Sequence, residues 1–343
     1  MTTLDAARRP AGMKVLVTGG GGFLGQAVVR ELRAHGHDPA VFNRSDYPEL
    51  AGEGIECRRG DLADVAAVRA ALRGRDAVIH VGAKAGPGLH RPEFIRANVD
   101  GTRNVIEACR SCGVGLLVYT SSPSVVHAGG DIEGGDESLP YPAHFPAPYP
   151  ETKALAECMV LAANDQDLRS VALRPHLIWG PGDKQLLPRL IARNRAGRLR
   201  LPAPEKRIDT VYIDNAAEAH RLALEDLAGP GRSAGKAYFI SNGEPRPVGE
   251  IIHSLLEAVG ETPRISRISP RLAMTAASLV ETLWRAFRLR ADPPLSRFMV
   301  EQLATAHWFD LAAAARDFGY RPRVGIDEGL HRLTAAAKLA PHG

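Results

Sequence analysis

The first 180 residues alternate short apolar runs with amphipathic segments, and this alternation restricts the possible folds more than any other feature. The apolar runs lack polar residues at every second position, which is typical of strands buried on both faces of a parallel sheet. Runs of this kind separated by helices predict an α/β fold, with a doubly wound parallel sheet of the Rossmann type. The runs lie within residues 14–17, 39–43, 76–83, 115–122 and 170–175, with a weaker predicted strand within 54–62. The predicted helices lie within 23–36, 64–74, 92–113 and 149–164.

A glycine-rich turn, TGGGGFLG, follows the first apolar run at residues 18–25. Gly19, Gly22 and Gly25 are spaced three apart between a predicted strand and a predicted helix. Glycine allows backbone angles that other residues resist, and the start of a helix offers unpaired N–H groups to phosphate. In this context the turn predicts a site for the pyrophosphate of a dinucleotide cofactor, with Phe23 and Leu24 beside it.

The residues after the second predicted strand distinguish between NAD and NADP. This strand ends in FNRSD, so that neutral Asn43 is followed by Arg44, whose guanidinium can hold a 2′-phosphate with two hydrogen bonds. NADP(H) is therefore favoured, and Asp46 keeps NAD as the alternative. Further cofactor contacts are expected at the ends of the third and fourth strands, from Asp61, Leu62, Gly82, Ala83 and Lys84.

Tyr149 and Lys153 lie four residues apart at the start of a predicted helix, and therefore on one helical face. A phenol exchanges protons poorly at neutral pH, but a fixed ammonium group nearby stabilises the phenolate. Serines at the end of the fifth strand, Ser121, Ser122 and Ser124, offer a hydroxyl that could hold a substrate oxygen. Together with the glycine turn, this pattern indicates proton transfer beside a nicotinamide cofactor.

These motifs resemble those of the extended short-chain dehydrogenases/reductases over residues 13–335. The matching segments are TGGGGFLG, GDL, ANVDGTRNVIEAC, VYTSS, YPETK and LRPHLIWGPGD. The resemblance implies that Tyr149 donates or accepts a proton and that Lys153 also bonds the nicotinamide ribose. It implies that Ser122, with Ser121 as the alternative, is the catalytic hydroxyl. It also places Asn98 near the active site, and Pro175 and His176 near the nicotinamide.

Within that family the segments VYTSSPSVV, TVYIDNAAEAHRLALEDL and KAYFISNGEP resemble the 3β-hydroxysteroid dehydrogenase branch. The resemblance is strongest to the bacterial 2-alkyl-3-oxoalkanoate reductases of long-chain olefin biosynthesis. It implies that NADPH reduces the keto group of a long-chain β-keto acid. A homodimer and a complex with other enzymes of olefin biosynthesis are the protein partners expected on this basis.

One departure from the family pattern is the loop VGAKAG at residues 81–86. Lys84 in this loop could hold the carboxylate of a β-keto acid, and the alternative is a solvated surface charge. Ser124 and His176 are further predicted substrate contacts.

Beyond residue 180 the pattern becomes mostly helical, with one clear strand at 236–241. We expect a flexible leader at 1–12, an NADP-binding domain at 13–180 to which parts of 205–245 return, and a mainly substrate-binding region at 181–343. Residues 270–290 carry an apolar stripe at helical spacing. Such a stripe usually packs on a core, and the alternatives are a lid or a face that lies on a membrane or partner. This region has few polar and basic residues for a second diphosphate, which favours a lipid-like substrate.

The net charge of +4 comes from scattered basic residues, which indicates no nucleic-acid partner. Four cysteines without a metal-binding pattern indicate a reduced setting and no metal site. Residues 1–12 contain no apolar segment typical of a signal peptide, and no run approaches the ~18 apolar residues of a membrane span. We therefore expect a cytoplasmic protein, with peripheral membrane contact as an alternative.

Three other functions agree with these motifs. The first is an NAD(P)-dependent 3β-hydroxysteroid or sterol-4-carboxylate 3-dehydrogenase, and the second a sugar-nucleotide epimerase or reductase. The third is a non-catalytic NADP sensor, against which the intact pair of Tyr149 and Lys153 argues.

Overall fold

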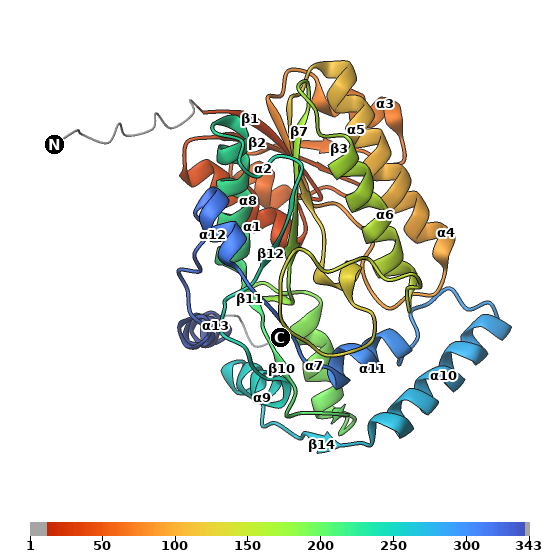
Figure 1. The fold of residues 1–343 in the computed structure, drawn as a ribbon. Coiled ribbons are helices and arrows are strands. Elements are labelled where there is room, and N and C mark those ends of the chain that lie inside the picture. Colours follow the sequence, from red (N-terminus) through yellow and green to blue (C-terminus); the bar gives the residue numbers. More distant parts are fainter. Residues whose placement is uncertain (1–11, 340–343) are drawn as a thin grey trace.

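The computed structural model describes residues 12–339, so residues 1–11 of the predicted leader lie outside the described range. Its centre is a seven-stranded parallel sheet in the order β12-β7-β5-β4-β1-β2-β3, which confirms the predicted fold class (Figure 1). The neighbours of β1 are β2 and β4, so the strand order reverses direction there. The strands are β1 (Lys14–Thr18), β2 (Asp38–Asn43), β3 (Glu56–Arg59), β4 (Ala77–His80), β5 (Leu116–Thr120), β7 (Arg169–Pro175) and β12 (Ala237–Ile240).

Helices cover both faces of this sheet. Successive strand residues point to opposite faces, and their apolar side chains are buried under these helices. Val15 and Val17 of β1 pack into one hydrophobic cluster, and Leu16 between them packs into another. The first cluster includes residues of α1 (Phe23–Ala34) and α8 (Ile213–Ala228). The second includes residues of α3 (Val65–Leu72), α5 (Gly101–Cys112) and α6 (Pro148–Ala162). The apolar runs without alternation therefore correspond to strands that are buried on both faces, while the edge strand β3 is mostly exposed.

The long helix predicted at 92–113 forms in three parts. It begins as α4 (Arg91–Phe94), continues as a π-helical segment at Ile95–Asp100, and ends as α5. A π-helical segment adds a residue to a turn and is common at functional sites. The segment brings the buried Asn98 to the start of α6, where the candidate active site lies.

Short strands that the sequence pattern did not indicate lie between residues 132 and 309. The strand at 236–241 is confirmed as β12 (Ala237–Ile240) at the edge of the main sheet, and α12 (Ala312–Phe318) packs on β12 and on α8. Most of the missed strands are only two residues long, which is too short for an alternation of apolar and polar residues to be visible. They are β6 (Ile132–Gly135), β8 (Ile178–Trp179), β9 (Arg200–Leu201), β10 (Arg207–Ile208), β11 (Val211–Tyr212), β13 (Arg246–Pro247), β14 (Ser266–Arg267) and β15 (His307–Phe309).

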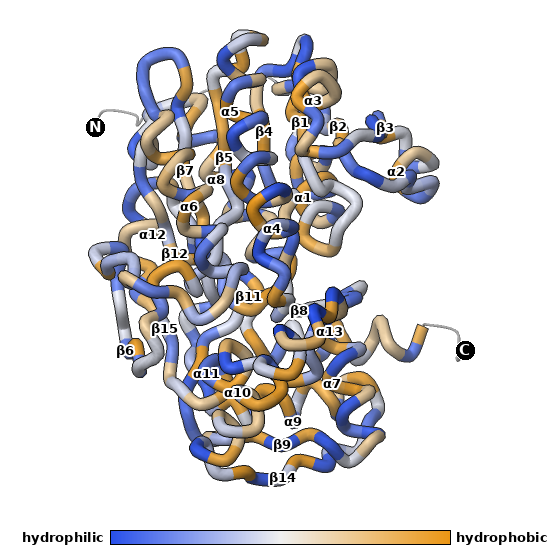
Figure 2. The backbone as a smooth tube through the Cα atoms, turned by 90° about the vertical axis from the view of Figure 1, so that its right-hand side faces the viewer, coloured by the Kyte–Doolittle hydropathy of each residue, from blue (hydrophilic) through white to orange (hydrophobic). Residues whose placement is uncertain are grey.

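A group of helices lies below the carboxyl ends of the main strands in the view of Figure 2. It contains α7 (Leu186–Arg195), α9 (Val248–Ala258), α10 (Pro270–Ala286) and α11 (Arg297–Ala304), while α13 (Ile326–Leu339) packs on α9. A short α2 (Pro48–Gly52) precedes β3. In the described range, no helix is both long and apolar enough to cross a membrane.

Candidate active site

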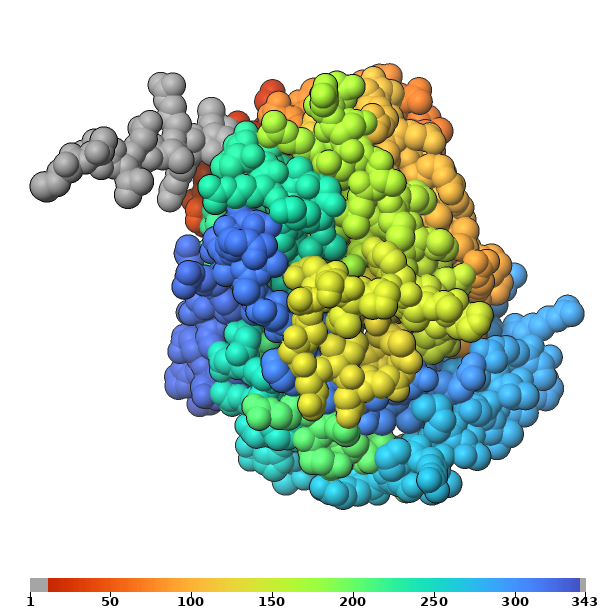
Figure 3. All heavy atoms as spheres, in the orientation of Figure 1, coloured from red at the N-terminus to blue at the C-terminus, as the bar shows by residue number. Residues whose placement is uncertain are grey.

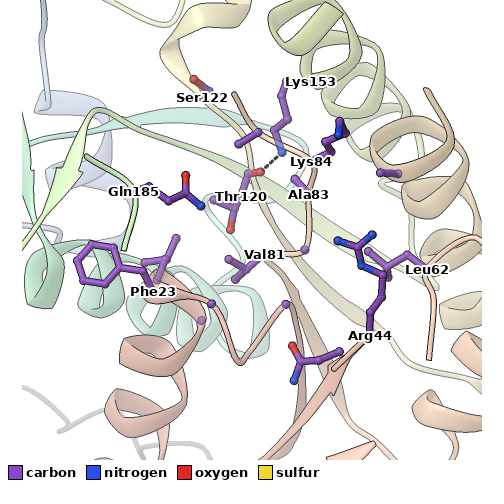
Figure 4. Close-up of a pocket in the computed structure, with 18 of the residues that line it drawn as sticks. Phe23, Arg44, Leu62, Val81, Ala83, Lys84, Thr120, Ser122, Lys153 and Gln185 are labelled. Carbon is purple, nitrogen blue, oxygen red and sulfur yellow. Dashed lines mark hydrogen bonds between the residues drawn. The ribbon is translucent and has the colours of Figure 1, made fainter. Parts of the chain in front are cut away.

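A cavity of about 840 Å³ lies at the carboxyl ends of the central strands, where the strand order reverses beside β1 (Figure 4). In open α/β sheets this position is the usual ligand site. Most of the predicted site residues line it. They are Gly19, Gly22, Phe23, Leu24, Gly25, Arg44, Asp61, Leu62, Gly82, Ala83, Lys84, Ser121, Ser122, Tyr149, Lys153 and Pro175.

The glycine turn has the geometry that a pyrophosphate group requires. Gly19 has a φ of +67°, and a Cβ atom there would lie 2.7 Å from the Cα of Gly82. A Cβ on Gly25 would collide with the carbonyl oxygen of Gly19, so the helix packs directly on the turn. Gly22 begins α1 without a side-chain cap, which leaves the first N–H groups of the helix available to phosphate. These residues therefore fit a dinucleotide cofactor.

Two polar contacts hold this turn in place. The Gly21 N–H donates to Oδ1 of Asn43 at 3.0 Å, which ties the turn to the end of β2. On the other side, the Thr18 hydroxyl accepts from the Gly82 N–H at 3.2 Å and lies 2.6 Å from Nδ1 of His80. Burial lowers the pKa of His80 to about 3, so this ring is neutral. The sequence indicates only that Asn43 is neutral. Its hydrogen bond with Gly21 is not predictable from the local pattern.

One end of the cavity contains Arg44 and Leu62, which lie side by side in Figure 4. Arg44 is exposed at its cavity position. Asp61 also lines the cavity and forms an ion pair with Arg96 at 2.8 Å. Asp46, the residue that favoured NAD, does not line the cavity and pairs with Arg59 at 3.4 Å.

At the opposite end, α6 presents Tyr149 and Lys153 beside Ser122 (Figure 4 labels Lys153 and Ser122). The helix begins with Pro148, a residue well suited to a first helical position. The Lys153 ammonium is buried, donates to the carbonyl oxygen of Thr120, and lies 4.2 Å from the ring centroid of Tyr119.

Burial shifts both titratable groups of this pair toward their neutral forms. It lowers the pKa of Lys153 to about 7, against an opposing effect of the Glu157 carboxylate. Burial also raises the pKa of Tyr149, and the hydrogen bond with Ser122 opposes this shift. The phenol is therefore protonated at neutral pH, and Lys153 titrates in the physiological range. This arrangement can donate a proton to a carbonyl oxygen held between Tyr149 and Ser122.

Asn98 connects the cavity wall to the start of α6. Its side chain accepts from the Lys84 N–H at 2.7 Å and donates to the Lys84 carbonyl and the Thr152 hydroxyl, each at 3.0 Å. Thr152 directly precedes Lys153, so the amide fixes the loop at 82–85 against the catalytic helix. Asn98 is 1% exposed and does not line the cavity.

Two predicted substrate contacts, Ser124 and His176, do not line the cavity. Ser124 lies behind Ser122, with their hydroxyl oxygens 2.9 Å apart. His176 is also a predicted cofactor contact. Pro175 at the end of β7 and Leu177 line the cavity, whereas His176 between them stacks on His307.

Part of the cavity wall was missed in the sequence. Leu177, Ile178, Gln185 and Leu186, which follow β7 in the chain, also line it. Leu177 has a φ of +34°, a strained conformation for leucine that is more common at functional sites. Phe298 of α11 also approaches Tyr149, with the ring centroids 6.4 Å apart. The segment LRPHLIWG contains the first two residues, but only the tertiary structure shows which of them face inward.

The model of the 3-beta hydroxysteroid dehydrogenase/isomerase family matches residues 16–269. The chain belongs to this family. It is 56% identical over 329 residues to the 2-alkyl-3-oxoalkanoate reductase of Stenotrophomonas maltophilia, covering 95% of this chain and 99% of that protein. It is 43% identical to the protein of the same name from Shewanella oneidensis, covering 98% of this chain and 89% of that protein. Among solved structures, the UDP-glucose 4-epimerase of Thermus thermophilus, in complex with NAD, aligns with a TM-score of 0.73. That alignment has 26% identity and covers 96% of this chain and all of the epimerase.

Membership of the 3-beta hydroxysteroid dehydrogenase/isomerase family gives the cavity a chemical class. The protein is an oxidoreductase of the short-chain dehydrogenase/reductase type and uses a nicotinamide cofactor. This agrees with a cavity that has the glycine turn on one side and, at one end, the half-buried Tyr149 and the buried Lys153.

Proposed function

We propose that this protein is an NADPH-dependent reductase of long-chain 2-alkyl-3-oxoalkanoic acids, which it converts to 2-alkyl-3-hydroxyalkanoic acids in olefin biosynthesis. The observation that carries the proposal is the presence of Tyr149, Lys153 and Ser122 in the cavity that contains the glycine turn. The names of the relatives at 56% and 43% identity support this choice of substrate.

The residues of the cavity have distinct roles in this reaction. A nicotinamide cofactor, when bound, supplies the hydride that reduces the 3-oxo carbon. The Tyr149 hydroxyl donates its proton to the carbonyl oxygen, and the Ser122 hydroxyl donates a hydrogen bond that holds this oxygen in place. The ammonium group of Lys153 stabilises the tyrosinate that remains until a proton from solvent restores the phenol.

The walls near this end of the cavity suit an alkyl chain. Leu177, Ile178 and Leu186 contribute apolar surface, and Phe298 packs near Tyr149. Apolar walls with a few polar groups at the reacting end are typical of sites for lipid-like molecules.

The direct test measures NADPH oxidation with a long-chain 2-alkyl-3-oxo acid, beside a 3-oxosteroid, a UDP-4-keto-sugar and the matched ketone, which is the keto acid without its carboxylate. The ketone is a necessary control because β-keto acids lose carbon dioxide spontaneously. We expect the keto acid to have the highest kcat/KM. A higher value for the steroid would overturn the proposal in favour of a steroid dehydrogenase, the activity that the family description suggests.

Arg44 tests the choice of cofactor. Because its guanidinium would contact the 2′-phosphate, Arg44→Gln is expected to raise the KM for NADPH roughly ten- to a hundredfold. The KM for NADH should stay unchanged, since NADH has no phosphate there. Asp46→Asn is the matched control and should change neither constant, because Asp46 lies outside the cavity lining. Equal effects of Arg44→Gln on both cofactors would contradict this assignment.

Lys84 tests recognition of the substrate carboxylate. Lys84 lines the cavity, and its ammonium group forms an ion pair with the Glu93 carboxylate at 2.9 Å. The hydrogen bond within this ion pair is the main cause of the lowered pKa of Glu93. If Lys84 binds the keto acid, Glu93 competes with the substrate for the ammonium group. We therefore expect Lys84→Met to raise the KM for the keto acid and Glu93→Gln to lower it.

The matched ketone, which has no carboxylate, separates this effect from a change in the cavity wall. Neither substitution should change its KM by more than about twofold, the range of weak exposed ion pairs. Parallel changes for acid and ketone would mean that Lys84 acts on the loop and not on the carboxylate.

A further inference from the structure

Helix α10 presents its large apolar side chains to solvent and its small ones to the protein. Leu272, Leu279, Leu283 and Phe287 lie on the stripe noted in the sequence, and they are 60%, 61%, 43% and 71% exposed. The side that faces α11 instead contains Ala273 and Ala277, which pack with Val300 in a small separate cluster. The expectation that the stripe packs on a core is therefore wrong. Figure 3 shows this light-blue segment protruding at the lower right of the molecule.

The exposed surface of the same segment is basic, so the expectation that this region has few basic residues is wrong. Residues 270–291 contain four arginines, Arg271, Arg285, Arg288 and Arg290, and one acidic residue, Glu281. All four arginines are exposed, whereas Glu281 is 1% exposed and accepts from Arg285 and Arg297 at 3.0 and 3.1 Å. The solvent-facing side of α10 thus combines apolar side chains with positive charge and has no carboxylate of its own.

This surface lies next to the substrate end of the cavity. Asp292, directly after the segment, packs against the backbone of Gly86 and Gly88 in the loop that follows cavity residue Ala85. Arg290 is close enough to the cavity residue Glu93 to contribute to lowering its pKa, after the larger effects of Lys84 and His90. The connection then enters α11, whose Phe298 approaches Tyr149.

We propose that α10 lies on an anionic phospholipid membrane, with its leucines and Phe287 in the interface and its arginines at the lipid phosphates. Helices that bind bilayers in this way have a large apolar face and basic residues on the polar side. An anionic surface attracts the four exposed arginines. It would repel no exposed carboxylate within the segment, because Glu281 is buried. The position of α10 would place the active site within reach of lipid-like substrates in the bilayer.

The test uses the full chain and vesicles of one part phosphatidylglycerol to two parts phosphatidylcholine, in a flotation assay without substrate. The wild-type protein should float with these vesicles and stay behind with phosphatidylcholine alone. Leu283→Ser/Phe287→Ser should weaken binding roughly tenfold or more, because apolar area no longer enters the interface. Arg288→Gln/Arg290→Gln should weaken it roughly fivefold for each arginine removed.

Matched controls come from exposed residues far from α10. Val65→Ser/Leu339→Ser removes apolar side chains that are 39% and 84% exposed, and Arg69→Gln/Arg73→Gln removes two exposed arginines, one within α3 and one at its C-terminal end. Both controls should float like the wild type. Unchanged Tm and unchanged NADPH oxidation with a short, soluble ketone would show that the α10 variants are folded.

Three results would overturn the inference. One is the absence of preferential flotation: the wild-type protein either stays behind or floats equally with neutral vesicles. Another is α10 variants that bind as tightly as the controls. The last is a smaller oligomer in sedimentation velocity for Leu283→Ser/Phe287→Ser, which would identify a second copy of the chain as the partner of α10. Because vesicle binding is measured without substrate, these outcomes do not depend on the proposed reaction.

Discussion

Tyr149→Phe is expected to lower kcat by roughly two to four orders of magnitude, the range of general acid catalysis. The substitution removes one hydroxyl group, which lies beside Ser122 in the cavity. The affinity for NADPH should change little, because the glycine turn and Arg44 that would bind the phosphates lie elsewhere in the cavity. Stopped-flow measurement of the chemical step, together with a fluorescence titration of NADPH, checks both statements.

Tyr141→Phe is the matched control for this substitution. Tyr141 does not line the cavity, and its hydroxyl donates to Glu157 at 2.6 Å. We expect a small loss of stability from this control and an unchanged chemical step. Reduction of the keto acid by Tyr149→Phe at the wild-type rate would require another proton donor and would refute the assigned role.

Lys153→Met is expected to reduce kcat/KM roughly a hundredfold or more and to raise the stability of the cofactor-free protein at pH 7. The loss of activity follows because no ammonium group then stabilises the tyrosinate. The gain in stability follows because Lys153 is 3% exposed, and burial lowers its pKa to about 7 from an ordinary value of 10.5. Thermal unfolding without cofactor should show a Tm higher by roughly a few degrees.

The pH dependence of that difference follows from the direction of the pKa shift. Between pH 7 and 10.5 the unfolded chain binds more protons at Lys153 than the folded chain does. The free energy of unfolding of the wild type therefore rises with pH in this window. The stability advantage of Lys153→Met should be complete below about pH 7 and disappear toward pH 10.5. Lys338→Met, at an exposed position on α13, should show no such advantage. An advantage independent of pH would mean that packing, and not charge burial, limits stability at Lys153.

The sequence by itself was sufficient for features that depend on short stretches of chain. The strand, glycine turn and helix of residues 14–34 follow one another directly, so their geometry is a local matter. The four-residue spacing of Tyr149 and Lys153 places both on one face of α6 in any helical structure. Strands buried on both faces leave a continuous apolar run, which is why the sheet was predictable as well.

Only the tertiary structure decided how distant segments meet. The contacts of Asn98 with Lys84 and Thr152, and the approach of Phe298 to Tyr149, join parts of the chain with no pattern in common. Periodicity also identifies residues that share a side without showing which side is covered. The sequence therefore could not show that His176 faces His307 and not the cavity, or that the apolar stripe of α10 faces solvent.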